Sequence, residues 1–101
     1  MGDREDAKQA QPVEIKVDEQ TIKGKYVNLA HIVHTPEDFT IDFIYVAPRP
    51  QVGILESRII LTPAHAKRLL AALQENISKY ETTFGQIPPA PEPMITPGAV
   101  H

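Results

Sequence analysis

The feature that most constrains the fold of this chain is a strand that runs into a long helix with almost no residues between them, in SRIILTPAHAKRLLAALQENISKYETTFG, residues 57–85. Thr62 can cap the helix, Pro63 suits its first position because its missing N–H would be unpaired there anyway, and Gly85 can end it. A stripe of apolar residues follows the helical spacing and predicts one buried face: Ala66, Leu69, Leu70, Leu73, Ile77, Tyr80 and Phe84.

Four segments before this helix predict β-strands, because β-branched and aromatic residues fill them and Pro, Asp or Glu separates them. They cover residues 13–18, 25–34, 39–47 and 52–61. The first segment alternates apolar and charged side chains, which is typical of an edge strand with one wet face. The predicted fold class is α+β: a four-stranded antiparallel meander followed by one long C-terminal helix.

The length of 101 residues predicts one small domain. Residues 1–11 are polar and without periodicity, and residues 88–101 hold five of the ten prolines, so we expect two flexible tails around a folded domain at residues 12–87. A domain of this size buries roughly 60 to 65% of its unfolded surface and is marginally stable without help. We therefore expect this chain to gain stability from a partner.

Composition argues against several classes of protein. The chain has no cysteine, a formal net charge of −3 and no apolar run of membrane-spanning length, so we expect a cytoplasmic protein without disulfides. The acidic balance makes nucleic acid an unlikely partner, and the cations at 67, 68 and 79 share the helix with Glu75 and Glu81. His31 and His34 point to opposite faces of a strand, so we expect no metal and no cofactor.

The two faces of the predicted sheet differ in composition. If residues 35–37 form the turn between the second and third strands, Val33 lies opposite Phe39 and Leu29 opposite Phe43. The odd-numbered face of the sheet is then the more apolar one, and we expect the helix to lie on it. The even-numbered face mixes polar groups with apolar side chains, among them the candidate interface residues Tyr26, Ile32, Ile44, Val46, Ile54 and Ile60.

One helix can cover only one face of the sheet, so the apolar part of the even-numbered face needs another cover. The simplest cover is a second copy, and the sequence predicts a two-fold homodimer formed sheet to sheet. A competing arrangement pairs the helix stripe with its twin, while the sheets close differently. In both cases the chain associates with itself.

Polar residues of the sheet predict a second kind of site. Asp42 and Arg58 fall opposite each other on the even-numbered face, near Asn28, and His65 lies in the first turn of the helix. An ordinary cross-strand ion pair is the favoured interpretation of Asp42 and Arg58. The alternative is a buried contact that fixes the register of a dimer or the position of a partner. The candidate polar constellation is Asn28, Asp42, Arg58 and His65.

The motifs of residues 22–87 resemble those of a family of short bacterial and archaeal proteins catalogued only as a domain of unknown function. The resemblance rests on G-x-Y-x-N, E-D-F-x-x-D-F, S-R-x-x-L-T-P-x-H-A-K-R-L and Y-E-x-x-F-G, in this order. It implies no activity. It does suggest that the polar residues of these motifs form one hydrogen-bonded group: Asn28, Asp42, Arg58, Thr62, His65 and Lys67.

No catalytic, metal or phosphate motif stands out, so an enzyme is not the favoured interpretation. We expect a non-catalytic, homo-oligomeric protein-interaction module, chaperone-like or adaptor-like, whose further partner is another protein. Its architecture is similar to that of the export chaperone SecB, although no motif residues are shared. The alternative is a small-ligand-binding protein or an enzyme with a polar site at the subunit interface.

Overall fold

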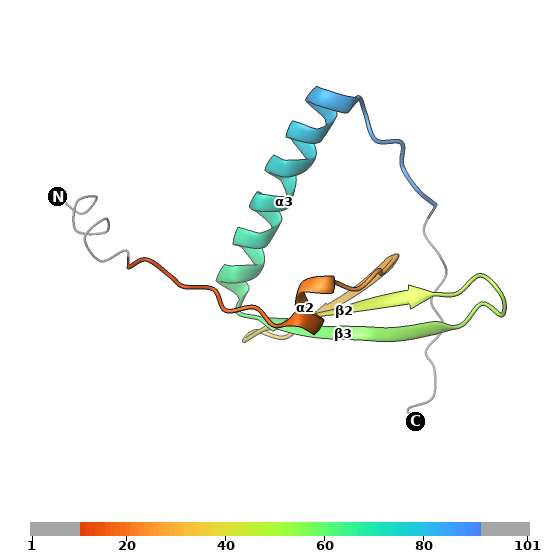
Figure 1. Cartoon of the computed structure of the whole chain (residues 1–101), viewed down its shortest axis with the longest axis horizontal. Coiled ribbons are helices and arrows are strands. Elements are labelled where there is room, and N and C mark those ends of the chain that lie inside the picture. Colours follow the sequence, from red (N-terminus) through yellow and green to blue (C-terminus); the bar gives the residue numbers. More distant parts are fainter. Residues whose placement is uncertain (1–10, 92–101) are drawn as a thin grey trace. The chain divides into compact units, whose positions relative to one another are not determined.

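The computed structural model describes residues 11–91 and shows an α+β chain with a three-stranded antiparallel sheet and a C-terminal helix (Figure 1). The strands are paired in the order β1-β2-β3, so β2 is central. In chain order the elements are α2 (Glu19–Lys23), β1 (Leu29–His34), β2 (Phe39–Val46), β3 (Gly53–Leu61) and α3 (Pro63–Phe84).

The prediction of four strands is wrong, because residues 13–18 form no strand. The apolar members of this alternation are exposed, with Val13 at 80%. Alternation distinguishes two faces, but only a neighbouring strand can satisfy the backbone N–H and C=O groups. Part of the expected loop after this segment instead forms the short helix α2, whose N-cap is Asp18.

Helix α3 begins and ends where the sequence predicts. The hydroxyl of Thr62 accepts a hydrogen bond from the backbone N–H of His65 at 3.2 Å, and Pro63 is the first helical residue. Gly85 follows the last helical residue with φ of 102°, a left-handed value that glycine adopts without strain, and its N–H donates to the carbonyl of Glu81. Both ends are therefore fixed by local chemistry.

The chain divides into two units, which are described separately. The first contains residues up to His31 together with Asp42–Arg58, and the second contains Ile32–Ile41 together with the residues from Ile59 onward. The first unit thus holds the hairpin between β2 and β3. The second unit holds the turn between β1 and β2, the end of β3 and all of α3.

The register of β1 against β2 differs by one residue from the prediction. In the second unit Thr35 closes the turn: its N–H donates to the carbonyl of Asp38 at 2.9 Å and its hydroxyl bonds the Asp38 carboxylate. This bond places His34 opposite Phe39, and their rings stack with centroids 5.5 Å apart, whereas Val33 was predicted opposite Phe39. In the first unit the N–H of Asn28 donates to the carbonyl of Ile44 at 3.1 Å.

Strand β3 contains one more residue than simple pairing with β2 would use. The N–H of Ala47 donates to the carbonyl of Val52, and a Cβ on Gly53 would lie 3.2 Å from Cγ2 of Ile44. Both observations place Gly53 on the even-numbered face. Uninterrupted alternation back from Arg58, whose guanidinium bonds Asp42, would place residue 53 on the other face. One extra residue between Gly53 and Arg58, a β-bulge, accounts for both.

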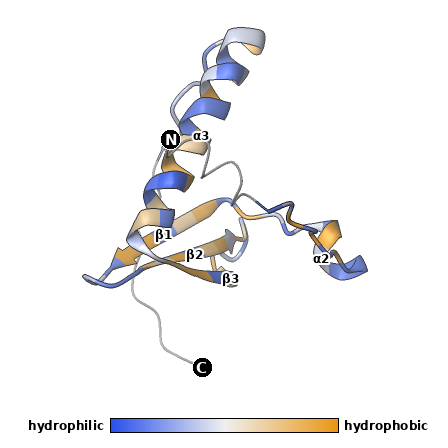
Figure 2. Cartoon of the chain, turned by 90° about the vertical axis from the view of Figure 1, so that its left-hand side faces the viewer, coloured by the Kyte–Doolittle hydropathy of each residue, from blue (hydrophilic) through white to orange (hydrophobic). Residues whose placement is uncertain are grey.

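The described residues form almost no core within the single chain. Only Ile41, on the central strand, is a buried hydrophobic residue, at 7% exposure. No residue of α3 is buried, and the large apolar side chains of its stripe are 40% to 72% exposed. Figure 2 shows apolar residues along the strands as well as on α3. Within the second unit, α3 therefore does not bury its stripe against the strand ends, contrary to the expectation that the helix covers its own sheet.

Candidate interaction surface and polar cluster

The candidate apolar surface of the first unit lies on β2 and the start of β3. Ile44 and Val46 extend from the central strand and have intermediate exposure, and Ile54 at the start of β3 is half exposed. Gly53 contributes no side chain over them, since a Cβ there would come within 3.2 Å of Ile44 and 4.0 Å of Val46. The side chain of Ile44 therefore lies directly beside the backbone of Gly53. We call Ile44 and Val46 the Ile44 patch.

Three other predicted interface residues are placed differently from these. Tyr26 precedes β1 and packs edge to face against Tyr45, with ring centroids 6.0 Å apart and an interplanar angle of 69°. Tyr45 alternates to the face opposite Ile44, so Tyr26 is grouped with that side chain. Ile32 and Ile60 belong to the second unit, where both are more than half exposed.

Asp42 and Arg58 form the strongest polar contact of the first unit. The guanidinium donates twice to the carboxylate, from Nε to Oδ1 at 2.7 Å and from Nη2 to Oδ2 at 2.9 Å. The Asp42 side chain is 15% exposed, whereas that of Arg58 is 57% exposed. This two-pronged geometry is typical of a strong arginine–carboxylate pair. Each group satisfies the other, which leaves little hydrogen-bonding capacity on Asp42 for a ligand.

The ion pair shifts the titration of both groups. The hydrogen bond from Arg58 holds the pKa of the Asp42 carboxyl below its ordinary value, although desolvation opposes part of this shift, and electrostatic interactions with Arg58 and His31 add to it. The same hydrogen bond raises the pKa of Arg58. Asp42 is therefore ionised throughout the neutral range.

This shift predicts a pH dependence of stability that depends on Asp42. Because the pKa of the folded state is lowered, the contribution is present above the unfolded pKa of about 4 and disappears as the pH falls through the folded value. In Asp42→Asn we expect a smaller loss of stability on acidification than in the wild type, measured as the urea midpoint from about pH 7 to about pH 3. Glu75→Gln removes the exposed partner of Lys79 and serves as the control. Equal slopes in Asp42→Asn and the wild type would contradict the assignment.

Asn28 acts as a continuation of the strand ladder. Its Nδ2 donates to the carbonyl of Val46 at 3.2 Å, and its Oδ1 accepts from the N–H of Val46 at 2.8 Å. The amide thus bonds Val46 as the backbone of a paired residue would. Among the residues that the structure describes, none of its hydrogen bonds goes to Asp42 or Arg58. The hydrogen bonds of Asn28 therefore tie it to Ile44 and Val46.

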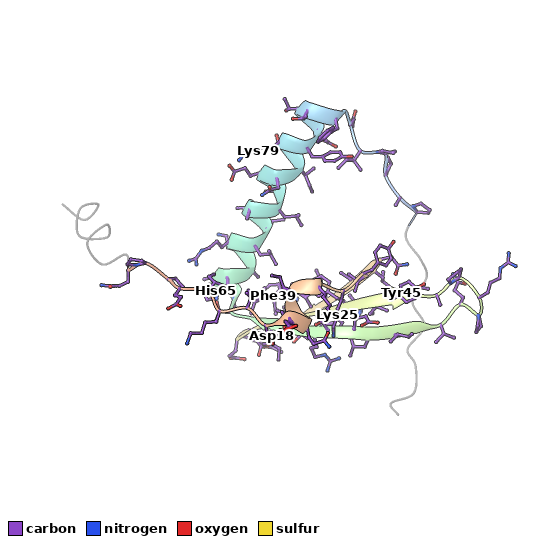
Figure 3. The ribbon with its side chains drawn as sticks, viewed as in Figure 1. Asp18, Lys25, Phe39, Tyr45, His65 and Lys79 are labelled. Carbon is purple, nitrogen blue, oxygen red and sulfur yellow. The ribbon has the colours of Figure 1, made fainter. Side chains whose placement is uncertain are left out.

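His65 is in the second unit, whereas the other three members of the polar constellation are in the first. It lies in the first turn of α3, where Figure 3 labels it, and its backbone N–H bonds Thr62. Neither unit by itself therefore gathers all four residues.

Sequence reasoning also missed a contact of the first unit, in which Nζ of Lys25 donates to the carbonyl of Glu56 at 3.1 Å. A long side chain that reaches a backbone carbonyl leaves no signal in a sequence pattern.

The structure adds the exposed face of α3 to the candidate surfaces. The sequence predicts that this stripe covers the chain's own sheet. The single residue between β3 and the helix was the one signal against that prediction.

Within residues 11–91 no group of three or more His, Asp or Glu side chains is arranged to hold a metal ion. In the same part of the chain neither helix combines the length and the apolar character that crossing a membrane requires.

Comparison with known proteins gives one match. A family model described as "Protein of unknown function (DUF3467)" covers residues 1–88. The match begins at the first residue and so includes the N-terminal segment that the sequence motifs leave out. No curated protein and no solved structure matches the chain.

Proposed function

We propose that this chain, which belongs to the DUF3467 family of proteins of unknown function, is a non-catalytic, homo-oligomeric protein-interaction module. A second copy covers apolar surface that one chain leaves open, and the assembled module then binds a further protein, as an adaptor or a chaperone does. The single observation that carries this proposal is the burial of only one hydrophobic side chain, Ile41, among the described residues.

A second copy is the best-supported partner. Nineteen large hydrophobic residues are exposed within the described part of the chain, which is more than a soluble monomer leaves in contact with water. Every copy carries the same Ile44 patch, so a two-fold axis brings two such patches together without any other molecule. On the same face the exposed guanidinium of Arg58, beyond its two bonds to Asp42, offers further N–H donors to a partner.

Replacing Ile44 by aspartate tests the Ile44 patch. We expect the wild type to scatter light as a multiple of the 11.2 kDa chain mass at micromolar concentration, and Ile44→Asp to lower that mass by half or more. The reason is that a carboxylate buried in an apolar contact is costly. Val13→Asp places the same charge at an exposed position outside the sheet and should leave the mass unchanged. A wild type that scatters as one folded chain at high concentration would overturn the proposal.

The small-ligand or enzyme alternative has less support. It needs Asn28, Asp42, Arg58 and His65 to offer free polar groups, yet Asp42 is hydrogen-bonded to Arg58 and the side-chain amide of Asn28 to Val46.

A cytoplasmic location belongs to the favoured proposal, because a chain without cysteine suits a reducing compartment.

A further inference from the structure

We infer that α3 covers the face of a second copy's sheet that carries Ile41, so that two chains exchange their helices. The inference rests on the proposed self-association and adds a second contact to it. In this arrangement the apolar stripe of α3 in one chain packs against the apolar strand ends in the second unit of the other chain.

The two surfaces that would meet are both open in the second unit. Along α3 the exposed members of the stripe include Leu70, Leu73 and Ile77. On the face of the strand ends that carries Ile41, Ile32 and Ile59 are 56% and 40% exposed. The second unit therefore holds a helix and a set of strand ends whose apolar sides do not cover each other.

The junction between β3 and α3 explains why the helix does not fold back. Thr62 is the only residue between the end of β3 and Pro63, whereas connections of this kind usually have two to six residues. A residue before proline is restricted to extended conformations, and Thr62 has φ of −68° and ψ of 158°. Its hydroxyl is also bonded to the N–H of His65. The junction is thus short and held extended, and short connections of this kind favour exchange between chains.

Dimensions support the exchange. The 22 residues of α3 span about 33 Å, and the 9 residues of β3 span about 30 Å, so the helix can cover the full length of the strands. One face of a three-stranded sheet has a footprint of roughly 400 Å². The apolar stripe of α3 adds roughly 300 Å². The helix exchange therefore occupies roughly 700 Å² per chain, close to the 800 Å² or so of a standard stable interface.

A contact through the even-numbered face alone reaches about half of that standard area. The exchange is therefore the larger of the two contacts. Because the two contacts use opposite faces of the sheet, both can form in one assembly, and removal of one does not remove the other.

Engineered cysteines test the exchange in the full-length chain, whose natural sequence has none. One variant carries Ile59→Cys, and a second, distinguished by a longer tag, carries a cysteine in the stripe at Leu69, Leu73 or Ile77. The two are unfolded together, refolded and mildly oxidised. We expect a covalent heterodimer for at least one of these positions, which lie about 6 Å apart along the helix, within the reach that a disulfide tolerates. Ile59→Cys with Gln74→Cys, on the polar side of α3, is the matched control and should stay uncoupled.

Each alternative occupant gives a different product. A covalent homodimer of Leu73→Cys alone, without the mixed product, would show that helices pair with their twins and would overturn the exchange. A chain with cysteines at both 59 and 73 that closes an internal disulfide would show that α3 folds back on its own sheet. Absence of the mixed product, with wild-type protein still oligomeric in light scattering, removes the exchange and leaves the proposed function standing. A monomeric wild type removes both.

Discussion

Leu73→Asp should lower the free energy of unfolding by about 3 kcal/mol or more, and at low protein concentration should leave the chain without a cooperative unfolding transition. Leu73 lies in the middle of the α3 stripe and is 54% exposed in the single chain. If the single chain were the complete folded unit, a charge at such a position would change stability by no more than about 0.5 kcal/mol. If the stripe is covered by a second copy, the same charge is buried without a partner.

The control for this variant is Gln74→Asp, which places the same charge one residue away on the polar side of the helix. It carries nearly the same change in helix dipole interaction and the same change in net charge, so it should unfold as the wild type does. Circular dichroism against urea, at two protein concentrations for each variant, measures the effect. Equal stability of Leu73→Asp and Gln74→Asp would contradict the covered stripe.

Ile41→Ala should lower the free energy of unfolding by about 2 to 4 kcal/mol. Ile41 is the buried hydrophobic residue of the described chain, in the middle of the central strand, so its truncation leaves a cavity between neighbours that pair on both sides. The total free energy of unfolding of a small domain is roughly 5 to 15 kcal/mol, so this loss is a large fraction of it.

Val13→Ala is the comparison for Ile41→Ala, because Val13 is exposed and outside the sheet. We expect Val13→Ala to change the free energy of unfolding, measured by urea denaturation, by less than about 0.5 kcal/mol. Ile41→Val, which removes one methylene group, should fall between them, at about 0.5 to 1.5 kcal/mol. A cost below about 1 kcal/mol for Ile41→Ala would mean that the centre of β2 is not a packed site.

Local chemistry explains which parts of the fold could be predicted from the sequence. The ends of α3 follow from Thr62, Pro63 and Gly85, whose effects act within one turn of the helix. The position of the turn between β1 and β2 follows from Thr35 and Asp38, but the register it sets, with His34 opposite Phe39, is one residue off the predicted one. The opposition of Asp42 and Arg58 across β2 and β3 follows from the same alternation.

The features that were missed depend on contacts between distant residues. Alternation in residues 13–18 predicts that the two sides of the segment face different environments. A β-strand also needs backbone hydrogen bonds to a neighbouring strand, which the alternation does not predict. The helix stripe predicts a covered face without naming the chain that covers it, and only the restriction at Thr62 argues against the chain's own sheet. The sequence predicts a polar site that includes Asn28. In the structure its side-chain amide forms the two hydrogen bonds to the Val46 backbone that a paired strand residue would form.

The single-residue junction at Thr62 also limits how genes of this family can change in length. Connections at the surface tolerate insertions and deletions because the elements on either side keep their places. An insertion between residues 61 and 63 would free the direction of the helix and alter which molecule it packs against. Across family members we therefore expect gaps to accumulate at the hairpin of residues 48–51, while the strand-to-helix junction keeps a constant length during evolution.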